Sequence, residues 1–261
     1  MTTIAPDQPV GVLLRHWRER RRMSQLDLAL ATEVSARHVS FVETGRSKPT
    51  RTMLLKLSEQ LDIPLRERNS LLLAGGFAPA YPQHELADIP LPAVTDAIGK
   101  ILDGHLPYPA LVVDRHWSMV DANAAVGALT AGVAPELLEP PVNVLRLSLH
   151  PAGLASRIGN LAQWRAHVLD RLSRQVLTTG DPKLAALHKE LREYPGGDDH
   201  NYDTRALVVP LRIDEYAFFS TTTVFGTPLD VTLAELAIEA FYPADEQTTA
   251  AFARVAGTGV N

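Results

Sequence analysis

The first 75 residues alternate apolar and polar positions with the period of short amphipathic helices. Between Val10 and Arg22, apolar residues recur at the i, i+3, i+4 and i+7 spacing that places them on one helical face. Ser24 followed by Asp27 is an acidic variant of the capping box, and Ser35 is a typical N-cap residue. This pattern predicts helices over residues 10–22, 25–31 and 36–43.

Two further helices are predicted before residue 75. One begins after Pro49 and Thr50, and the other begins after Pro64 and ends at Gly75 and Gly76. Short helices that follow one another so closely indicate a compact all-α domain of five helices over residues 10–75. It is preceded by an N-terminal tail of residues 1–9.

The character of the chain changes after residue 75. The segment from Gly75 to Pro92 contains four prolines and little periodicity, so residues 76–92 are predicted to be a linker. Beyond it, runs of β-branched and aromatic residues mix with helical patterns, which predicts an α+β domain with an antiparallel sheet over residues 93–256. The predicted strands span 110–114, 118–121, 204–213, 216–225 and 234–241, and the predicted helices span 123–129, 154–177, 183–192 and 245–255.

The net charge of −5 is divided unevenly along the chain. Residues 1–75 carry 12 Lys and Arg against 8 Asp and Glu, whereas residues 76–261 carry 13 against 22. A basic module beside an acidic body indicates contact with nucleic acid through the N-terminal part. The chain has no cysteine and no apolar run near the ~18 residues of a membrane span, so we expect a cytoplasmic protein without membrane contact.

The stretch from Gln25 to Thr50 has the features of a helix-turn-helix, in which two helices cross at a tight turn and the second enters the major groove. Small and apolar residues stand where such helices touch, at Leu28, Ala29, Val34, Val39 and Val42. The phrases SQLDLA, VSARHVSFVETGRSKPT and LLKLSEQL resemble the Xre family of bacterial and phage regulators. That family usually has glycine where this chain has Glu33. A left-handed backbone there would cost Glu33 roughly 1 kcal/mol relative to glycine.

Residues at the N-terminal end of the second helix would face base edges in this arrangement. Arg37 suits bidentate pairing with guanine, and Ala36 suits contact with a thymine methyl group. Gln25 matches a phosphate-contacting position of the resembling phage repressors, and the loop after the helix would pass the DNA backbone. Such modules usually act as dimers, so we expect a homodimer on double-stranded DNA. The predicted DNA-contacting residues are Gln25, Ser35, Ala36, Arg37, His38, Ser40, Arg46, Ser47, Lys48, Thr50 and Arg51.

The second domain resembles the MmyB-like ligand-binding domain found behind helix-turn-helix modules in actinobacterial regulators. The resemblance rests on PYPALVVDRHWSMVDANAA at residues 107–125, on residues 143–175, on DPKLAALHKEL at 181–191 and on LDVTLAELAIEAFYPAD at 229–245. It implies a PAS-like fold, a curved antiparallel sheet flanked by helices. It also implies an interior pocket for an apolar small molecule such as a fatty acid.

Apolar residues of this domain are candidates to line that pocket, although each is alternatively part of an ordinary packed core. Asn123 and Arg165 are the polar candidates to orient a head group, and Asn123 is alternatively the cap of the helix that follows it. The candidate ligand-binding residues are Leu111, Val113, Trp117, Met119, Asn123, Leu154, Ile158, Leu161, Trp164, Arg165, Phe218 and Val224.

The sequence carries no recognisable catalytic or metal-binding signature. It lacks zinc-site histidine spacing, a G-x-S-x-G elbow, a P-loop and G-x-G-x-x-G, so we expect neither an enzyme nor a bound cofactor or metal. Asp198, Asp199 and His200 follow a Pro-Gly-Gly turn and are interpreted as a polar loop. The favoured interpretation is a sequence-specific DNA-binding transcription regulator whose C-terminal domain modulates DNA binding. The alternatives are a protein-interaction or dimerisation adaptor with a ligand-free C-terminal domain and, less favoured, an enzyme tethered to DNA.

Overall fold

The computed structural model describes residues 8–84, 92–197, 209–226 and 230–258. The chain forms two compact units, an N-terminal unit made mainly of residues up to 86 and a sheet domain made mainly of the residues after it. Among the described residues, no helix combines the length and the apolar character that crossing a membrane requires.

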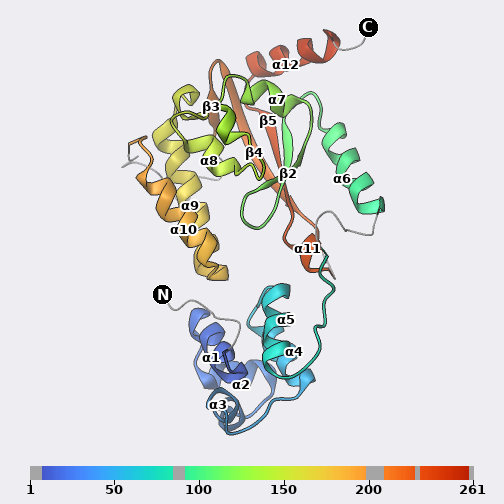
Figure 1. Ribbon diagram of the computed structural model, residues 1–261, viewed down its shortest axis with the longest axis vertical. Coiled ribbons are helices and arrows are strands. Elements are labelled where there is room, and N and C mark those ends of the chain that lie inside the picture. Colours follow the sequence, from blue (N-terminus) through green and yellow to red (C-terminus); the bar gives the residue numbers. More distant parts are fainter. Residues whose placement is uncertain (1–7, 85–91, 198–208, 227–229, 259–261) are drawn as a thin grey trace. The chain divides into compact units, whose positions relative to one another are not determined.

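The N-terminal unit is helical, as predicted. The side chains of Ser24, Ser35 and Thr50 each accept a hydrogen bond from a backbone N–H of the first turn of the helix that follows. These caps fix where the helices begin, so the predicted bounds agree closely with those of the structure. The helices (Figure 1) are α1 (Val10–Arg20), α2 (Gln25–Thr32), α3 (Ala36–Glu43), α4 (Arg51–Gln60) and α5 (Leu65–Ala74).

The helices of this unit enclose a core around Trp17, Leu28 and Val39, whose side chains are almost fully buried. At Gly11, α1 comes close to α3, because a Cβ at that position would meet the backbone oxygen of Val42. Only glycine permits this approach, which holds the first helix against the helix predicted to enter the major groove.

The sheet domain is built on one antiparallel sheet, which confirms the predicted α+β class. Its strand order is β2-β1-β5-β4-β3. All four residues of β1 are buried, as expected for a strand covered on both faces. The strands are β1 (Ala110–Val113), β2 (Met119–Ala122), β3 (Leu211–Ile213), β4 (Tyr216–Val224) and β5 (Ala237–Pro243).

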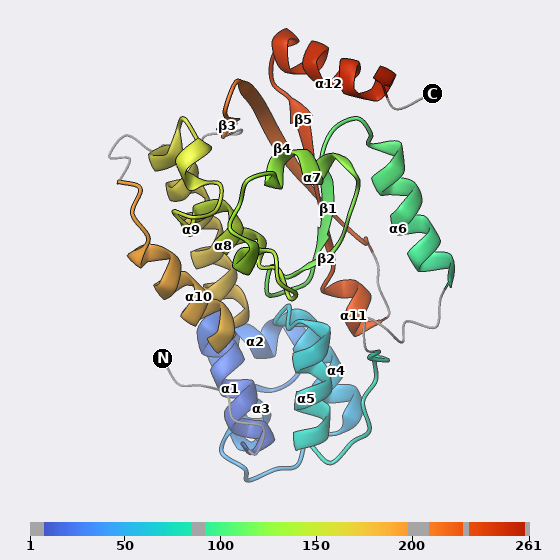
Figure 2. The same ribbon diagram turned by 45° about the horizontal axis from the view of Figure 1, so that its top comes forward.

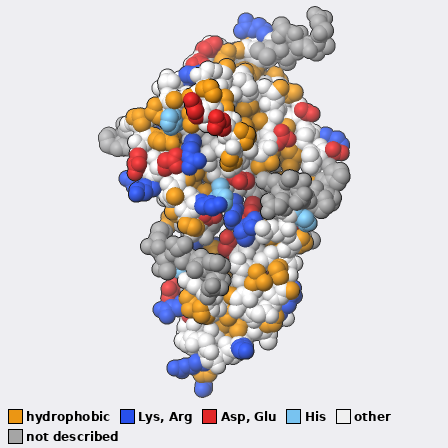
Figure 3. Space-filling model, viewed as in Figure 1, with side chains coloured by type: hydrophobic (Ala, Val, Ile, Leu, Met, Phe, Trp, Pro, Cys, Tyr) orange, Lys and Arg blue, Asp and Glu red, His pale blue; other side chains and the backbone are white. Residues whose placement is uncertain are grey.

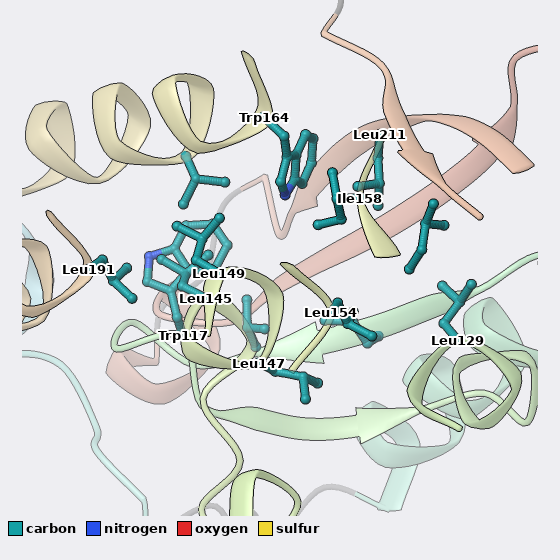
Figure 4. Packing of buried hydrophobic residues seen from close by; sticks show 14 of the residues in the cluster. Trp117, Leu129, Leu145, Leu147, Leu149, Leu154, Ile158, Trp164, Leu191 and Leu211 are labelled. Atoms are coloured by element: carbon teal, nitrogen blue, oxygen red, sulfur yellow. The ribbon is translucent and has the colours of Figure 1, made fainter. Parts of the chain in front are cut away.

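Helices cover this sheet from two sides. Figures 1 and 2 show α8, α9 and α10 on one side of the sheet and α6 on the other. The largest core cluster includes Trp117, Leu145, Leu154 and Trp164, which pack beside one another in Figure 4. The helices of the domain are α6 (Pro92–Gly104), α7 (Ala125–Thr130), α8 (Val144–Leu149), α9 (Leu161–Thr179), α10 (Pro182–Glu193) and α12 (Glu246–Thr258), and a short helix α11 (Val231–Ala234) precedes β5.

The single helix predicted over residues 154–177 is wrong in its first part. Ile158 forms an isolated β-bridge with Ile213, and the backbone N–H of Gly159 donates to the carbonyl oxygen of Arg212 at 2.9 Å. These contacts with β3 hold the chain extended, so α9 begins only after them. The apolar periodicity of the segment could not reveal partners more than 50 residues away.

Other differences from the predicted elements also lie after residue 91. The helices α6, α8 and α11 were not predicted, and β5 begins at Ala237 because α11 occupies residues 231–234. Residues 204–208 of one predicted strand, and the polar loop at residues 198–200, lie outside the described residues.

Candidate DNA interface and ligand pocket

The turn between α2 and α3 has the predicted backbone conformation. Glu33 lies in the left-handed region, with φ 54° and ψ 30°, although it is not a glycine. Its carboxylate accepts a hydrogen bond from Lys56 Nζ at 3.0 Å, an exposed pair that contributes little stability. Two residues later, Ser35 caps α3 by accepting from the backbone N–H of His38 at 3.2 Å. The α2–α3 geometry is therefore that of a helix-turn-helix.

Arginines gather around one aromatic ring on α3. The guanidinium groups of Arg37 and Arg46 lie 5.2 and 5.9 Å from the centre of the Phe41 ring, which positions both cations by cation–π contact. Lys and Arg side chains are also seen at the lower end of the face drawn in Figure 3, where Figure 1 labels α3. Of the predicted DNA-contacting residues, Ser35, Arg37, Arg46, Lys48, Thr50 and Arg51 are exposed, and Gln25, Ala36, His38, Ser40 and Ser47 are half-buried.

Behind this surface lies a buried ion pair that the sequence analysis did not identify. The guanidinium of Arg18 donates to both carboxylate oxygens of Glu43 at 2.7 and 2.9 Å, and to the carbonyl oxygen of Met23 at 2.8 Å. The Gln25 amide donates to the same carboxylate at 2.8 Å, so this predicted phosphate contact is engaged within the protein. A signal was present, because Arg18 lies four residues after Leu14 on the apolar face of α1.

The sheet domain contains a cavity of about 90 Å³ between the sheet and the helices α7, α8 and α9. Its wall is mostly apolar, and Figure 4 labels leucines of this wall that come from several elements: Leu129, Leu145, Leu147, Leu154 and Leu211. Among the predicted ligand-binding residues, those that line the cavity are Leu111, Trp117, Met119, Leu154 and Trp164. The apolar lining that sequence reasoning missed includes Leu129, Leu145, Leu147, Leu211 and Phe241.

The other apolar candidates do not line this cavity. Val113, Ile158 and Phe218 are buried in the surrounding core, and Leu161 is partly buried against it. Val224 faces outward from β4 and is 62% exposed. For the strand residues Val113, Phe218 and Val224, the alternation along a strand cannot by itself tell which face meets a cavity.

The two polar candidates are occupied with backbone groups. The Asn123 side chain accepts from the N–H of Ala110 at 3.2 Å and donates to the carbonyl oxygens of Leu102 and Tyr108 at 3.1 and 2.9 Å. It therefore does not cap α7, and it joins the end of α6 to β1. Arg165 donates to the carbonyl oxygens of Arg192 and Gly197 at 2.8 and 3.1 Å. Neither residue lines the cavity.

A different set of polar side chains borders the cavity. Arg171 on α9 forms a two-point ion pair with Glu239 on β5, through nitrogen–oxygen distances of 2.6 and 3.1 Å. His167, one turn before Arg171, also lines the wall. Burial lowers the pKa of His167, and the neighbouring Arg171 and Arg174 lower it further, so its imidazole is neutral at neutral pH.

Residues 94–255 match the family described as the MmyB-like transcription regulator ligand binding domain, which is more than half of the chain. The chain belongs to this MmyB-like family. Residues 14–68 of this MmyB-like protein also match a helix-turn-helix family, so both resemblances seen in the sequence are confirmed. Among the described residues, no group of three His, Asp or Glu side chains is arranged to hold a metal ion.

Relatives of the MmyB-like protein include uncharacterized HTH-type transcriptional regulators of Mycobacterium bovis and Mycobacterium tuberculosis. Each is 33% identical over 109 residues, which is 42% of this chain and 39% of the relative. The match thus spans about two fifths of the length of these relatives. The crystal structure of the clp gene regulator ClgR from Corynebacterium glutamicum aligns with 41% of this chain and 99% of its own, at 19% identity and a TM-score of 0.24. This similarity is too low to support a conclusion about this chain.

Proposed function

We propose that this chain is a transcription regulator that binds duplex DNA through α3 and the loop after it, and binds an apolar small molecule in the cavity of the sheet domain. The observation that supports the DNA half is a capped α3 that bears the exposed Arg37, beside a left-handed turn and followed by a loop that bears the exposed Arg46. The observation that carries the ligand half is a leucine-lined cavity in a domain of the MmyB-like ligand-binding family. Ligand binding is proposed to change DNA affinity, which requires that the ligand favour one of two conformations. No catalytic activity is proposed.

Arg37 is the proposed base-reading residue, and Lys48 is a proposed phosphate contact. Both are exposed, on α3 and on the loop after it respectively. A bidentate arginine–guanine contact discriminates between base pairs, whereas a lysine–phosphate contact adds affinity for any sequence. Ser35, His38 and Ser40 remain candidates for either kind of contact, and Gln25 and Ser47 remain candidates for phosphate contacts.

The test begins by selecting the preferred duplex from a random library and titrating it against an unrelated duplex at two salt concentrations. Arg37→Ala is expected to remove about 1–3 kcal/mol of discrimination between the two. Lys48→Ala is expected to weaken both duplexes alike and to reduce the salt dependence by about one ion. Lys100→Ala, an exposed lysine on α6, is the control of equal charge change. Equal losses on both duplexes for Arg37→Ala would contradict its assignment.

A homodimer is part of the proposal, because paired recognition helices read half-sites about 34 Å apart on one face of the duplex. Sedimentation velocity of the full chain with and without the selected duplex measures this. Two chains per duplex with a palindromic preferred sequence support the dimer, and one chain on a single half-site contradicts it.

The cavity of about 90 Å³ is smaller than the roughly 300–1,000 Å³ typical of pockets for drug-sized ligands. It therefore takes a short apolar chain as it stands, and a longer ligand requires the surrounding leucines to move. Purification without denaturant, solvent extraction and mass spectrometry are expected to recover one apolar molecule per chain. Leu129→Phe, which adds volume inside the cavity, is expected to abolish the recovery while the fold persists by circular dichroism. Equal recovery from both proteins would place the ligand elsewhere.

A further inference from the structure

The charged side chains in the cavity wall are already neutralised from within the protein. Arg171 Nη2 lies 2.6 Å from Glu239 Oε1, and Arg171 Nη1 lies 3.1 Å from Glu239 Oε2. The hydroxyl of Thr222 accepts from Arg171 at 2.7 Å and donates to Glu239 at 3.0 Å, which closes the network. The guanidinium carbon also lies 4.5 Å from the centre of the Trp117 ring, so the cation is held on two sides.

The net charge of the cavity wall depends on its titratable residues, which are Arg171, Glu239 and His167. The Glu239 side chain is 6% exposed and the Arg171 side chain is 30% exposed, so the ion pair is shielded from bulk water on the glutamate side. The charges of the pair cancel, and burial together with two neighbouring arginines keeps the His167 imidazole neutral. The lining therefore carries no net charge.

A ligand with a carboxylate head would bind in this cavity less favourably than one with a neutral head. It would leave water without gaining an uncompensated cation, and it would approach the carboxylate of Glu239. A hydroxyl or carboxamide head has a smaller desolvation cost and can hydrogen-bond to the same polar groups. The apolar part of either molecule would gain equally from the leucine-lined remainder of the cavity.

We infer that this pocket selects an uncharged amphipathic molecule, a short alkyl or acyl chain with a hydroxyl or carbonyl head, over the corresponding carboxylate, and therefore over the ionised fatty acid that the family resemblance implies. This rests on the proposed function of the cavity as a ligand site. Glu239 is the residue that sets the selection, because it satisfies Arg171 and repels a second anion. Removing the charge of Glu239 would leave Arg171 as an unpaired cation facing the cavity.

The experiment uses three probes of equal chain length at pH 7.5: 1-octanol, octanamide and octanoate. Quenching of tryptophan fluorescence reports binding, because Trp117 and Trp164 line the cavity. With the full wild-type chain, octanol and octanamide are expected to bind about tenfold or more tightly than octanoate, a difference of about 1.4 kcal/mol. Octanoate binding as tightly as the neutral probes overturns the inference and leaves the ligand site intact.

Glu239→Gln provides the second arm, since the amide keeps the shape and removes the charge. Octanoate is expected to gain about tenfold in affinity for this variant, whereas octanol changes less than about threefold. Glu190→Gln is the matched control, because Glu190 forms a similar two-point pair with Arg146 but does not line the cavity. Should Glu239→Gln fail to fold, the wild-type ranking of the probes decides the inference alone. If no probe binds to the wild-type chain and solvent extraction yields no ligand, the proposed pocket itself is overturned, and the inference with it.

Discussion

Two arginine–glutamate pairs, one in each unit, place the same chemistry in different surroundings. Arg18 and Glu43 join α1 to α3 with side-chain exposures of 9% and 1%. Arg171 and Glu239 join α9 to β5 with exposures of 30% and 6%. Both pairs have two-point geometry, and each glutamate is almost completely removed from water. They differ in what occupies the space beside them.

The pair in the N-terminal unit has further partners from the protein itself. The carbonyl oxygen of Met23 and the amide of Gln25 complete its hydrogen bonds. The pair in the sheet domain has Thr222 as a further partner and lines the apolar cavity, whereas Glu43 lines a more open groove beside α1. A buried ion pair whose hydrogen bonds are met by the protein stabilises one arrangement of helices. A buried ion pair beside an unfilled volume also determines what can enter that volume.

Replacing Glu43 with alanine is expected to have the largest effect, because it leaves Arg18 buried without an anion. The expected loss of stability in the N-terminal unit is about 3–5 kcal/mol. Amide hydrogen exchange of peptides from α1 and α3 measures this loss separately from the sheet domain. Glu59→Ala, on the exposed side of α4, is the control and is expected to change stability by less than about 0.5 kcal/mol.

A double variant distinguishes the cost of leaving Arg18 unpaired from the stabilisation that the intact ion pair provides. Combining Arg18→Met with Glu43→Leu removes both charges and fills the space with apolar groups, which often restores the stability that a single change removes. The double variant is therefore expected to recover most of the loss. A double variant as unstable as Glu43→Ala would show that the pair, rather than its broken half, stabilises the unit.

Glu239→Gln is expected to cost less than Glu43→Ala, about 1–2 kcal/mol in the sheet domain without ligand. Its partner Arg171 is 30% exposed and keeps the ring of Trp117 and the hydroxyl of Thr222 as contacts. Hydrogen exchange of peptides from β5 and α9 provides the measurement. A loss equal to that of Glu43→Ala would remove the distinction between the two pairs.

The pair of Arg146 and Glu190 supplies an exposed reference, with side-chain exposures of 44% and 35%. Glu190→Gln is expected to cost about 0.2–1 kcal/mol at neutral pH. The hydrogen bond from Arg146 lowers the pKa of Glu190 below its ordinary value of 4.5, with burial opposing and Tyr194 adding to the shift. The stabilisation by the Glu190 carboxylate is therefore complete above pH 4.5 and is lost as the pH falls through the lowered pKa. The free energies of unfolding of the variant and the wild type should become equal in acid. Denaturation at pH 7 and in acid checks this, and a gap that persists in acid contradicts it.

The N-terminal unit was predictable because its signals are local. Each of the caps hydrogen-bonds to a backbone group only three residues later, and these caps are Ser24, Ser35 and Thr50. The left-handed turn at Glu33 is the conformation that the family pattern implies. The Arg18–Glu43 pair was not predicted, since its partners lie 25 residues apart. An arginine on an apolar helical face was the one local sign of it.

The sheet domain was predictable in class and in most of its strands, but its cavity was predicted only in part. Which strand residues face the cavity depends on register and on which helices cover the sheet. Arg171 and Glu239 are 68 residues apart, and nothing in either local sequence indicates the other. For the same reason, Asn123 was assigned to a head group or a cap, whereas its partners are backbone groups of α6 and β1.

The residues that line the cavity come from different parts of the chain. Trp117, which carries Arg171 above its ring, and Leu129 lie at opposite ends of the view in Figure 4. The charge and the chain length of the proposed ligand are therefore expected to depend on separate residues. A smaller residue at position 129 is therefore expected to admit longer molecules to the proposed pocket and to leave the proposed selection against a carboxylate unchanged, which would suit the pocket to use in a biosensor.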